Sequence, residues 1–230
     1  MEQLVFDLVP PELPSFANFL PGRNAEAVAA CERFASGATS ERGLVLWGAP
    51  GAGTTHLLRA AVASGAARGA AATYIWDPGA LVAMDPDTLA AQEIVAVDAL
   101  ESAGADAQAR LFTLFNALQA AGHRFVGAAK VAPATIKLRE DLRTRLGSCL
   151  VYEIVPLGDD EKPAALAGYA RGRGFAIPDE VIRYLLAHGR RDMSSLQRAL
   201  AALDRQSLAA RRPITVPMLR AWLQRDIGFS

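Results

Sequence analysis

The stretch that decides the fold is Gly43-Leu-Val-Leu-Trp-Gly-Ala-Pro-Gly-Ala-Gly-Thr-Thr-His-Leu-Leu58. Its first residues are an apolar run that ends at Gly48, which predicts a short buried strand. From Thr54 to Arg68, leucine, valine and alanine recur at helical spacing, which predicts a helix. Between them, Gly48–Thr55 has the GxxxxG spacing of a phosphate-binding P-loop, in the strand-to-helix context that such a loop requires. Backbone N–H groups of this loop can turn inward around an anion, and the helix N-terminus adds a positive dipole.

The loop departs from a complete P-loop at one position. The glycines of the cradle are present as Gly48, Gly51 and Gly53, but the lysine expected next is Thr54. Thr55 keeps the hydroxyl that would bind Mg²⁺. Because phosphoryl transfer depends mainly on electrostatic stabilisation, loss of the lysine should weaken binding and impair hydrolysis strongly. Two interpretations stay open: a site for ADP or ATP, with Mg²⁺ only alongside the nucleotide, or a glycine-rich turn that binds nothing.

Further apolar runs alternate with helical patterns as far as residue 156. Strands are expected at 72–77, 94–98, 124–130 and 149–154, and helices at 24–35, 106–121 and 140–146. Continuously apolar strands that alternate with helices predict a parallel sheet covered on both faces. After Pro156 only helices are expected, at 159–171, 178–188, 193–209 and 216–225. The predicted fold is therefore α/β, with a five-stranded parallel sheet between helices, followed by a small all-α domain.

The same pattern predicts three segments. Residues 1–15 contain the Pro10–Pro11 pair and Pro14, which indicates an extended tail. Residues 16–157 form the α/β body, and residues 158–230 form the helical domain. Asn24 and Asp159 are expected at or near helix starts, because their side chains suit capping positions.

The composition limits the class of protein. The chain has 24 Lys and Arg against 24 Asp and Glu, and zero net charge argues against a protein that mainly wraps nucleic acid. The N-terminal segment lacks the basic region of a signal peptide, and no apolar stretch reaches 18 residues. A cytoplasmic protein without a membrane span is therefore expected. Cys31 and Cys149 lie among apolar or small residues and are expected as buried thiols.

A second carboxylate motif accompanies the loop. The apolar run Ile94–Val97 ends in Asp98, which is the pattern of a strand that presents a carboxylate to Mg²⁺ beside the P-loop threonine. Thr55 and Asp98 are therefore the expected metal-binding pair, should a nucleotide be bound. The alternative for Asp98 alone is a polar strand terminus.

With these residues in hand, the chain resembles the DnaA/Hda branch of the AAA+ proteins over nearly its whole length. Phe16–Asn24 looks like the opening segment of that branch, which implies that Phe16 and Asn18 lie beside the adenine. Gly53–Leu58 is similar to the family's GKTHLL and implies a nucleotide-binding role for His56. The resemblance implies an AAA+ P-loop domain followed by a helical lid domain.

Two further segments carry the resemblance. Leu138–Leu146 resembles the family's box before the fifth strand, whose final arginine is an arginine finger, here Arg145, with Arg143 as the alternative. Such a finger acts in trans on a neighbouring subunit's nucleotide and needs no nucleotide of its own. Arg191-Asp-Met-Ser-Ser-Leu196 resembles the sensor 2 segment of the lid, which implies that Arg191 lies over the phosphates.

The chain also departs from active members of that class. Ala99 replaces the acid that usually follows Asp98, and Glu101 could take its place only with a rearranged backbone. Lys130 stands at the end of the fourth strand, where the family often has a polar or acidic residue. Two interpretations of Lys130 stay open: an amine near the phosphates that partly offsets the missing lysine, or an exposed lysine at a strand end.

The tail contains a short peptide pattern. Gln3-Leu-Val-Phe-Asp-Leu8 looks like the peptide by which Hda proteins bind the replicative sliding clamp. The amide of Gln3 would occupy a polar subsite, while Leu4 and Phe6 or Leu8 would fill an apolar pocket. The alternatives are an N-terminal strand that pairs with the body, or a chance match.

These features predict a regulator that contacts partners. It would bind the sliding clamp, dock on ATP-loaded DnaA and stimulate that protein's ATP hydrolysis through Arg145, and it could associate with further copies of itself. Direct sequence-specific DNA binding is not expected, because no helix-turn-helix or basic arm is present. The alternatives are a self-sufficient ATPase with an unusual P-loop, and an assembly scaffold with a nonfunctional nucleotide pocket.

Overall fold

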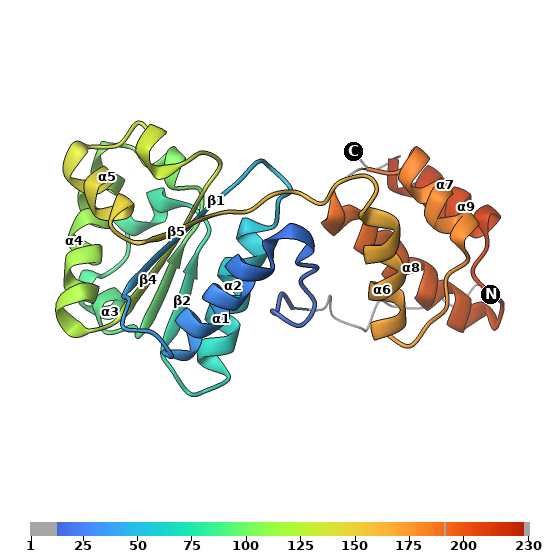
Figure 1. Ribbon diagram of the computed structural model, residues 1–230, viewed down its shortest axis with the longest axis horizontal. Coiled ribbons are helices and arrows are strands. Elements are labelled where there is room, and N and C mark those ends of the chain that lie inside the picture. Colours follow the sequence, from blue (N-terminus) through green and yellow to red (C-terminus); the bar gives the residue numbers. More distant parts are fainter. Residues whose placement is uncertain (1–12, 191, 228–230) are drawn as a thin grey trace. The chain divides into compact units, whose positions relative to one another are not determined.

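The chain divides into two compact units in the computed structural model, residues 1–154 and residues 155–230 (Figure 1). The structure describes residues 13–190 and 192–227. Within this part of the chain, no helix is both long and apolar enough to cross a membrane.

The first unit is built on a five-stranded sheet. Its strands are β1 (Gly43–Trp47), β2 (Ala72–Ile75), β3 (Ile94–Val97), β4 (Arg124–Ala129) and β5 (Leu150–Glu153). The order across the sheet is β2-β3-β4-β1-β5, and every pairing is parallel. All five carboxyl ends therefore meet at one edge, where an open α/β sheet places its ligands.

Helices cover both faces of this sheet (Figure 1). One face is covered by α1 (Ala25–Ser36) and α2 (Thr54–Ala66). The other is covered by α4 (Ala105–Ala121) and α5 (Glu140–Gly147), together with α3 (Pro86–Ala90) and the 3₁₀ turn η2 (Pro78–Val82). Three further 3₁₀ turns are η1 (Gly22–Asn24), η3 (Leu100–Ser102) and η4 (Pro133–Thr135).

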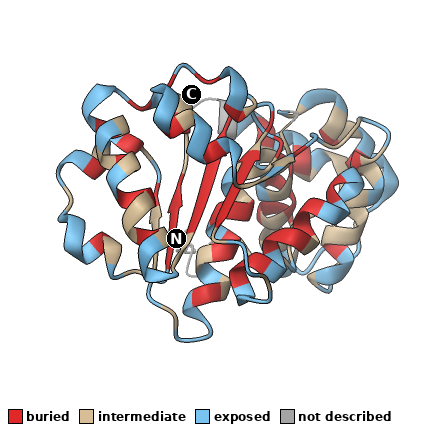
Figure 2. Cartoon of the chain, turned by 60° about the vertical axis from the view of Figure 1, so that its left-hand side comes forward, coloured by how far each residue is buried: buried red, intermediate tan, exposed pale blue. Residues whose placement is uncertain are grey.

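The central strands are the most buried part of the first unit (Figure 2). Every residue of β3 is buried, and so are five of the six residues of β4. Their side chains alternate between the two apolar clusters, so that Val95 faces the α4 side and Ala96 the α2 side. Alternation between two covered faces explains why these strands are continuously apolar in sequence.

The second unit is all-helical. It contains α6 (Lys162–Gly172), α7 (Asp179–His188), α8 (Met193–Ala210) and α9 (Val216–Ile227). Leucines and isoleucines from the four helices form its core, with Leu166, Leu200 and Leu219 fully buried. The α/β sheet with flanking helices and the helical C-terminal region confirm the predicted fold class.

Several local predictions were wrong. Asp159 does not start α6, because the helix begins at Lys162 and Asp159 instead pairs with the Lys162 amine at 2.7 Å. Asn24 holds the first capping position of α1, but its side chain makes no capping hydrogen bond. Helix α3 and the four 3₁₀ turns were not expected, because elements this short carry too few residues for a periodic signal.

Two other expectations need adjustment at the sheet edge. The burial of β5 alternates between half-buried and exposed, because β5 is an edge strand and does not lie between two neighbours. Cys31 is buried as expected, whereas Cys149 is only partly buried. Burial nevertheless raises the pKa of both thiols to about 12, so neither is a reactive thiolate.

Candidate functional site

The P-loop joins β1 to α2 at the carboxyl edge of the sheet. Gly51 and Gly53 have φ values of 84° and 105°, a left-handed backbone region that favours glycine. A side chain at Gly53 would also collide with the Phe19 ring, whose nearest carbon lies 2.6 Å from the ideal Cβ position. Phe19 therefore packs directly on the loop. Thr54 begins α2, so the first N–H groups of this helix lack intrahelical partners and point toward the loop.

Thr55 and Asp98 lie together at this edge. The Thr55 hydroxyl donates a hydrogen bond to Asp98 Oδ2 at 2.6 Å, although the two residues are 43 positions apart. The Tyr74 hydroxyl donates to the same oxygen at 2.9 Å, and the backbone N–H of Ala99 donates to Asp98 Oδ1 at 2.8 Å. Burial and the Asp98 carboxylate both raise the pKa of Tyr74, so Tyr74 stays protonated and remains a donor. The structure thus brings together the two residues expected to bind Mg²⁺.

The segment after Asp98 turns sharply. Ala99 adopts a left-handed conformation with φ of 51°, and the 3₁₀ turn η3 follows. The turn brings Glu101 beside Lys130, and its replacement of the missing second acid stays a prediction. The Glu101 carboxylate lies 3.2 Å from the Lys130 amine and accepts the Lys130 backbone N–H, also at 3.2 Å.

These groups line one cavity of about 190 Å³. Its lining comes from the P-loop, the ends of β2 to β4 and η3: Gly48, Ala49, Pro50, Gly51, Thr54, Thr55, Trp76, Asp98, Ala99, Glu101, Ala129 and Lys130. A polyphosphate fits this donor set, because the loop glycines hold the cradle open and Thr55 lies beside Asp98 as a magnesium site requires. When bound, magnesium would neutralise phosphate charge there.

The opening segment packs on the P-loop helix. Asn18 uses its side chain locally, accepting the Ser15 N–H at 2.8 Å and donating to the Leu13 carbonyl at 3.0 Å. His56 Nε2 lies 2.9 Å from the Ser15 carbonyl oxygen, and its ring contacts Phe19 with centroids 5.3 Å apart. Phe16 packs at the edge of the α2-side core. His56 therefore holds the opening segment in place, and adenine contacts from Phe16 and Asn18 remain a prediction.

Burial lowers the pKa of His56 from its usual 6.5, so the folded protein keeps this imidazole neutral. Below about pH 6.5 the His56 imidazole binds a proton in the unfolded chain but stays neutral in the folded chain. Protonation therefore favours the unfolded state, and the free energy of unfolding falls as the pH drops below that value. We expect the free energy of unfolding to be lower at about pH 5.5 than at about pH 7.5. Urea unfolding of the parent and a His56→Gln variant checks this, since an equal pH dependence in both would assign the effect elsewhere.

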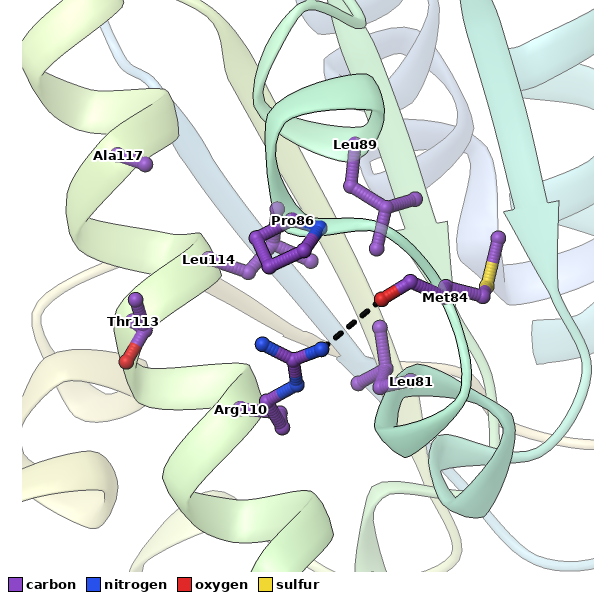
Figure 3. A pocket seen from close by; sticks show the side chains of 8 residues that line it. All are labelled: Leu81, Met84, Pro86, Leu89, Arg110, Thr113, Leu114 and Ala117. Atoms are coloured by element: carbon purple, nitrogen blue, oxygen red, sulfur yellow. Dashed lines mark hydrogen bonds between the residues drawn. The ribbon is translucent and has the colours of Figure 1, made fainter.

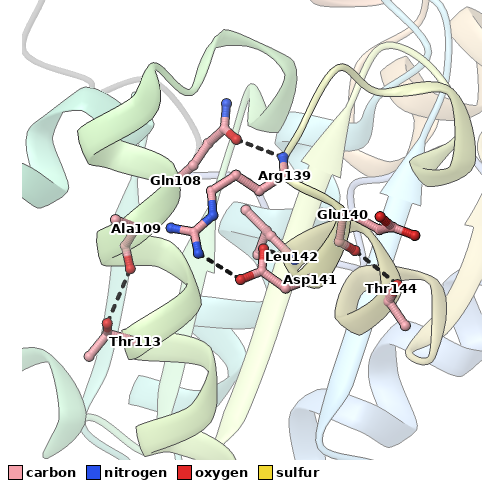
Figure 4. Close-up of polar contacts among 8 residues, drawn as sticks. All are labelled: Gln108, Ala109, Thr113, Arg139, Glu140, Asp141, Leu142 and Thr144. Atoms are coloured by element: carbon pink, nitrogen blue, oxygen red, sulfur yellow. Dashed lines mark hydrogen bonds and ion pairs between the residues drawn. The ribbon is translucent and has the colours of Figure 1, made fainter.

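Arg145 lies on a separate face, on helix α5. It is exposed, and its guanidinium lies 5.9 Å from the centroid of the half-buried Phe112 ring. Arg139 contacts the same ring at 5.9 Å but is also bound to the Asp141 carboxylate at 2.7 Å (Figure 4). Arg143 is half-buried. Of the two candidates for the finger, Arg145 is therefore the more accessible.

The start of α5 is held by polar contacts shown in Figure 4. Gln108 of α4 accepts the backbone N–H of Arg139 at 2.8 Å, and Asp141 accepts the Leu142 N–H at 2.8 Å. Leu142 and Leu146 are fully buried on the opposite side of the helix. These contacts fix the direction in which α5 presents its arginines.

A second, smaller hollow lies between α4 and the η2–α3 segment (Figure 3). Its volume is about 30 Å³, and three leucines and Met84 form half of its lining residues. Arg110 also lines it and donates a hydrogen bond to the Met84 carbonyl at 2.9 Å. At that size it does not accommodate a nucleotide.

Other predicted site residues lie outside the described part of the chain: Arg191 and the tail residues Gln3, Leu4, Phe6 and Leu8. Sequence reasoning missed three residues of the site. Tyr74 and Trp76 come from β2 and its end, and Phe19 from the opening segment. The sequence signals were weak, because Tyr74 is typical of any strand and Trp76, 70% exposed, resembles any surface aromatic.

The comparisons with known proteins agree with this geometry. Residues 159–223 match the family model described as Hda, lid domain. Domain III of DnaA from Thermotoga maritima superposes with a TM-score of 0.75 at 18% identity, covering 94% of this chain and 98% of that one. AMPPCP-bound DnaA from Aquifex aeolicus gives 0.72 at 19% identity, and this chain spans 66% of its length. The Thermotoga maritima RuvB branch migration motor gives 0.63 at 16% identity, covering 92% and 71%.

The parallel sheet, the P-loop with its partner Asp98 and the helical C-terminal unit define the fold of the AAA+ proteins. Together with the Hda lid match over 159–223, they make this chain an Hda-like protein whose fold is related to that of DnaA.

Proposed function

We propose that this protein regulates replication initiation by acting on partners. Its N-terminal tail would bind the sliding clamp, and its body would dock on ATP-loaded DnaA and insert Arg145 beside the bound nucleotide. The observation that carries the proposal is the exposed Arg145 on a rigidly held α5, in a chain whose fold is that of DnaA. A finger in this position would stabilise the charge that develops on the transferred phosphate in DnaA's own site.

The P-loop site supports a protein that acts on the nucleotide of DnaA and does not hydrolyse its own. Thr54 stands where the phosphate-binding lysine would be, and Ala99 stands where the second acid would be. Both losses affect groups that would serve a nucleotide of this chain, whereas Arg145 would serve a nucleotide of another protein. ADP or ATP, with Mg²⁺ between Thr55 and Asp98, would therefore have a structural role here.

A self-sufficient ATPase is the second candidate, favoured by the intact contact between Thr55 and Asp98. ATP turnover by the isolated chain separates the two proposals. A regulator should show no turnover alone and should accelerate hydrolysis by DnaA when the clamp is loaded on DNA. Turnover by the isolated chain that does not change on addition of DnaA would support the second candidate.

Changing Gln3 and Leu4 together to alanine is expected to weaken clamp binding about thirtyfold, because the two side chains would fill the polar and apolar subsites that anchor the peptide. Binding to immobilised clamp measures this loss directly. Glu12→Gln, beyond the motif, is the matched control and should bind as the parent does. Equal binding by the double variant and the parent would remove the tail from the proposal.

A further inference from the structure

Lys130 occupies the position in the sheet that best complements the P-loop. Strand β4 lies between β1, which leads into the P-loop, and β3, which leads to Asp98. Because the strands are parallel, Lys130 at the end of β4 emerges between these two groups at the same edge. It lines the same cavity as Thr54, Thr55 and Asp98.

The charge of this cavity depends on Lys130. Among the described residues that line it, Asp98 and Glu101 are acidic and Lys130 is the basic one. Without that amine, two carboxylates would face an incoming phosphate and repel it. With it, the phosphate would meet a cation and the N-terminus of α2 together.

Glu101 is held as the counter-ion of Lys130. Leu100 anchors η3 against Gly127 of β4, where an added Cβ would lie 2.7 Å from the leucine methyl, and this places the next residue, Glu101, over the strand end. The Lys130 side chain is 64% exposed and that of Glu101 is 21% exposed. Because the Lys130 amine is largely exposed, it can turn toward a ligand of higher charge, and the buried Glu101 oxygen that it leaves must then move out to water.

We propose that Lys130 is the phosphate-binding cation of this site, supplying from β4 the charge that residue 54 lacks, and that the phosphate displaces Glu101. The ligand class is the polyphosphate group of a nucleoside di- or triphosphate. The inference rests on the proposed nucleotide site and names the residue that makes phosphate binding possible there.

The test is a calorimetric titration of the full chain with ADP. Lys130→Ala should weaken binding about tenfold, since a charge-assisted contact to phosphate is lost, and Lys130→Arg should retain most of the affinity.

Glu101→Gln should tighten binding of ADP severalfold, because its amide oxygen still accepts the Lys130 backbone N–H while the competing negative charge is gone. In the double variant Lys130→Ala, Glu101→Gln, the gain from the second substitution should disappear. Lys137→Ala, an exposed lysine before α5, should bind as the parent does.

Pyrophosphate serves as the second ligand, because it carries the phosphate contacts without the nucleoside. The same ranking of variants with pyrophosphate supports the proposal. Parent-like ADP binding by Lys130→Ala, unchanged or weaker binding by Glu101→Gln, or no ADP binding by the parent each overturns it. Circular dichroism confirms that the variants are folded. Since the titration contains neither DnaA nor clamp, failure of the proposed regulation would appear separately, in the ATPase assay.

Discussion

Replacing Arg145 with alanine is expected to lower the stimulation of DnaA's ATP hydrolysis about a thousandfold, because an arginine finger stabilises charge only in the transition state. Arg145 is exposed on α5, where its removal costs one contact with the Phe112 ring and leaves the buried leucines of the helix in place. The variant should therefore fold and bind the clamp as the parent does. Single-turnover hydrolysis of ATP on DnaA, with clamp loaded on DNA, measures the effect.

Two neighbouring arginines provide matched controls. Arg139→Ala removes a guanidinium that contacts the same ring but is already bound to Asp141, so stimulation should change little. Arg143→Ala tests the alternative finger, and its half-buried side chain predicts a smaller effect. If Arg145→Ala stimulates as well as the parent, the proposed mechanism is wrong. If only Arg143→Ala fails to stimulate, the finger is Arg143.

Phe125→Ala is expected to lower the free energy of unfolding of the first unit by about 3–5 kcal/mol, because it leaves a large cavity in the core. Phe125 is fully buried in β4 and packs edge-on against Phe115 of α4, with ring centroids 5.4 Å apart. Loss of the ring removes one of the contacts between β4 and α4. Phe125→Leu keeps part of the volume and should cost about 1 kcal/mol.

The measurement has to report on the first unit alone, since the chain contains two compact units and two-state unfolding of the whole chain is not expected. The chain has three tryptophans, two in the first unit and Trp222 in the second. In a Trp222→Phe background, tryptophan fluorescence during urea unfolding therefore follows the first unit. Val151→Ala on the edge strand β5 is the control and should change the stability by about 0.5 kcal/mol. A loss that small for Phe125→Ala would contradict the core described here.

Much of the fold could be predicted because its signals are local. The buried strands are continuous apolar runs, and the long helices repeat apolar residues at helical spacing, so both are visible within a short window of sequence. The P-loop and Asp98 were found for the same reason, since each lies at the end of such a run. Helix α3 and the turn at Ala99 were missed, because short or left-handed segments depend on contacts with distant residues.

The site was only partly predictable. Thr55 and Asp98 were paired from their motifs, and the structure places them in direct contact. Tyr74 donates to Asp98 from the neighbouring strand. This contact could not be predicted, because a local sequence pattern does not reveal which strands lie next to each other in the sheet. His56 was expected beside the nucleotide from its place in a motif, and that role stays a prediction. In the structure its ring contacts the Ser15 carbonyl and Phe19.

The sequence by itself determined the class of fold, the position of the phosphate loop and the loss of its lysine, because each depends on residues that are close together along the chain. Only the tertiary structure decided which charged groups lie around residue 54, where the lysine is missing. Placing β4 between β1 and β3 brings Lys130 to the P-loop cavity, and the turn after Asp98 brings Glu101 to Lys130. The physical reason is that charges act through space, and the distance between two charges is known only once the strand order is known.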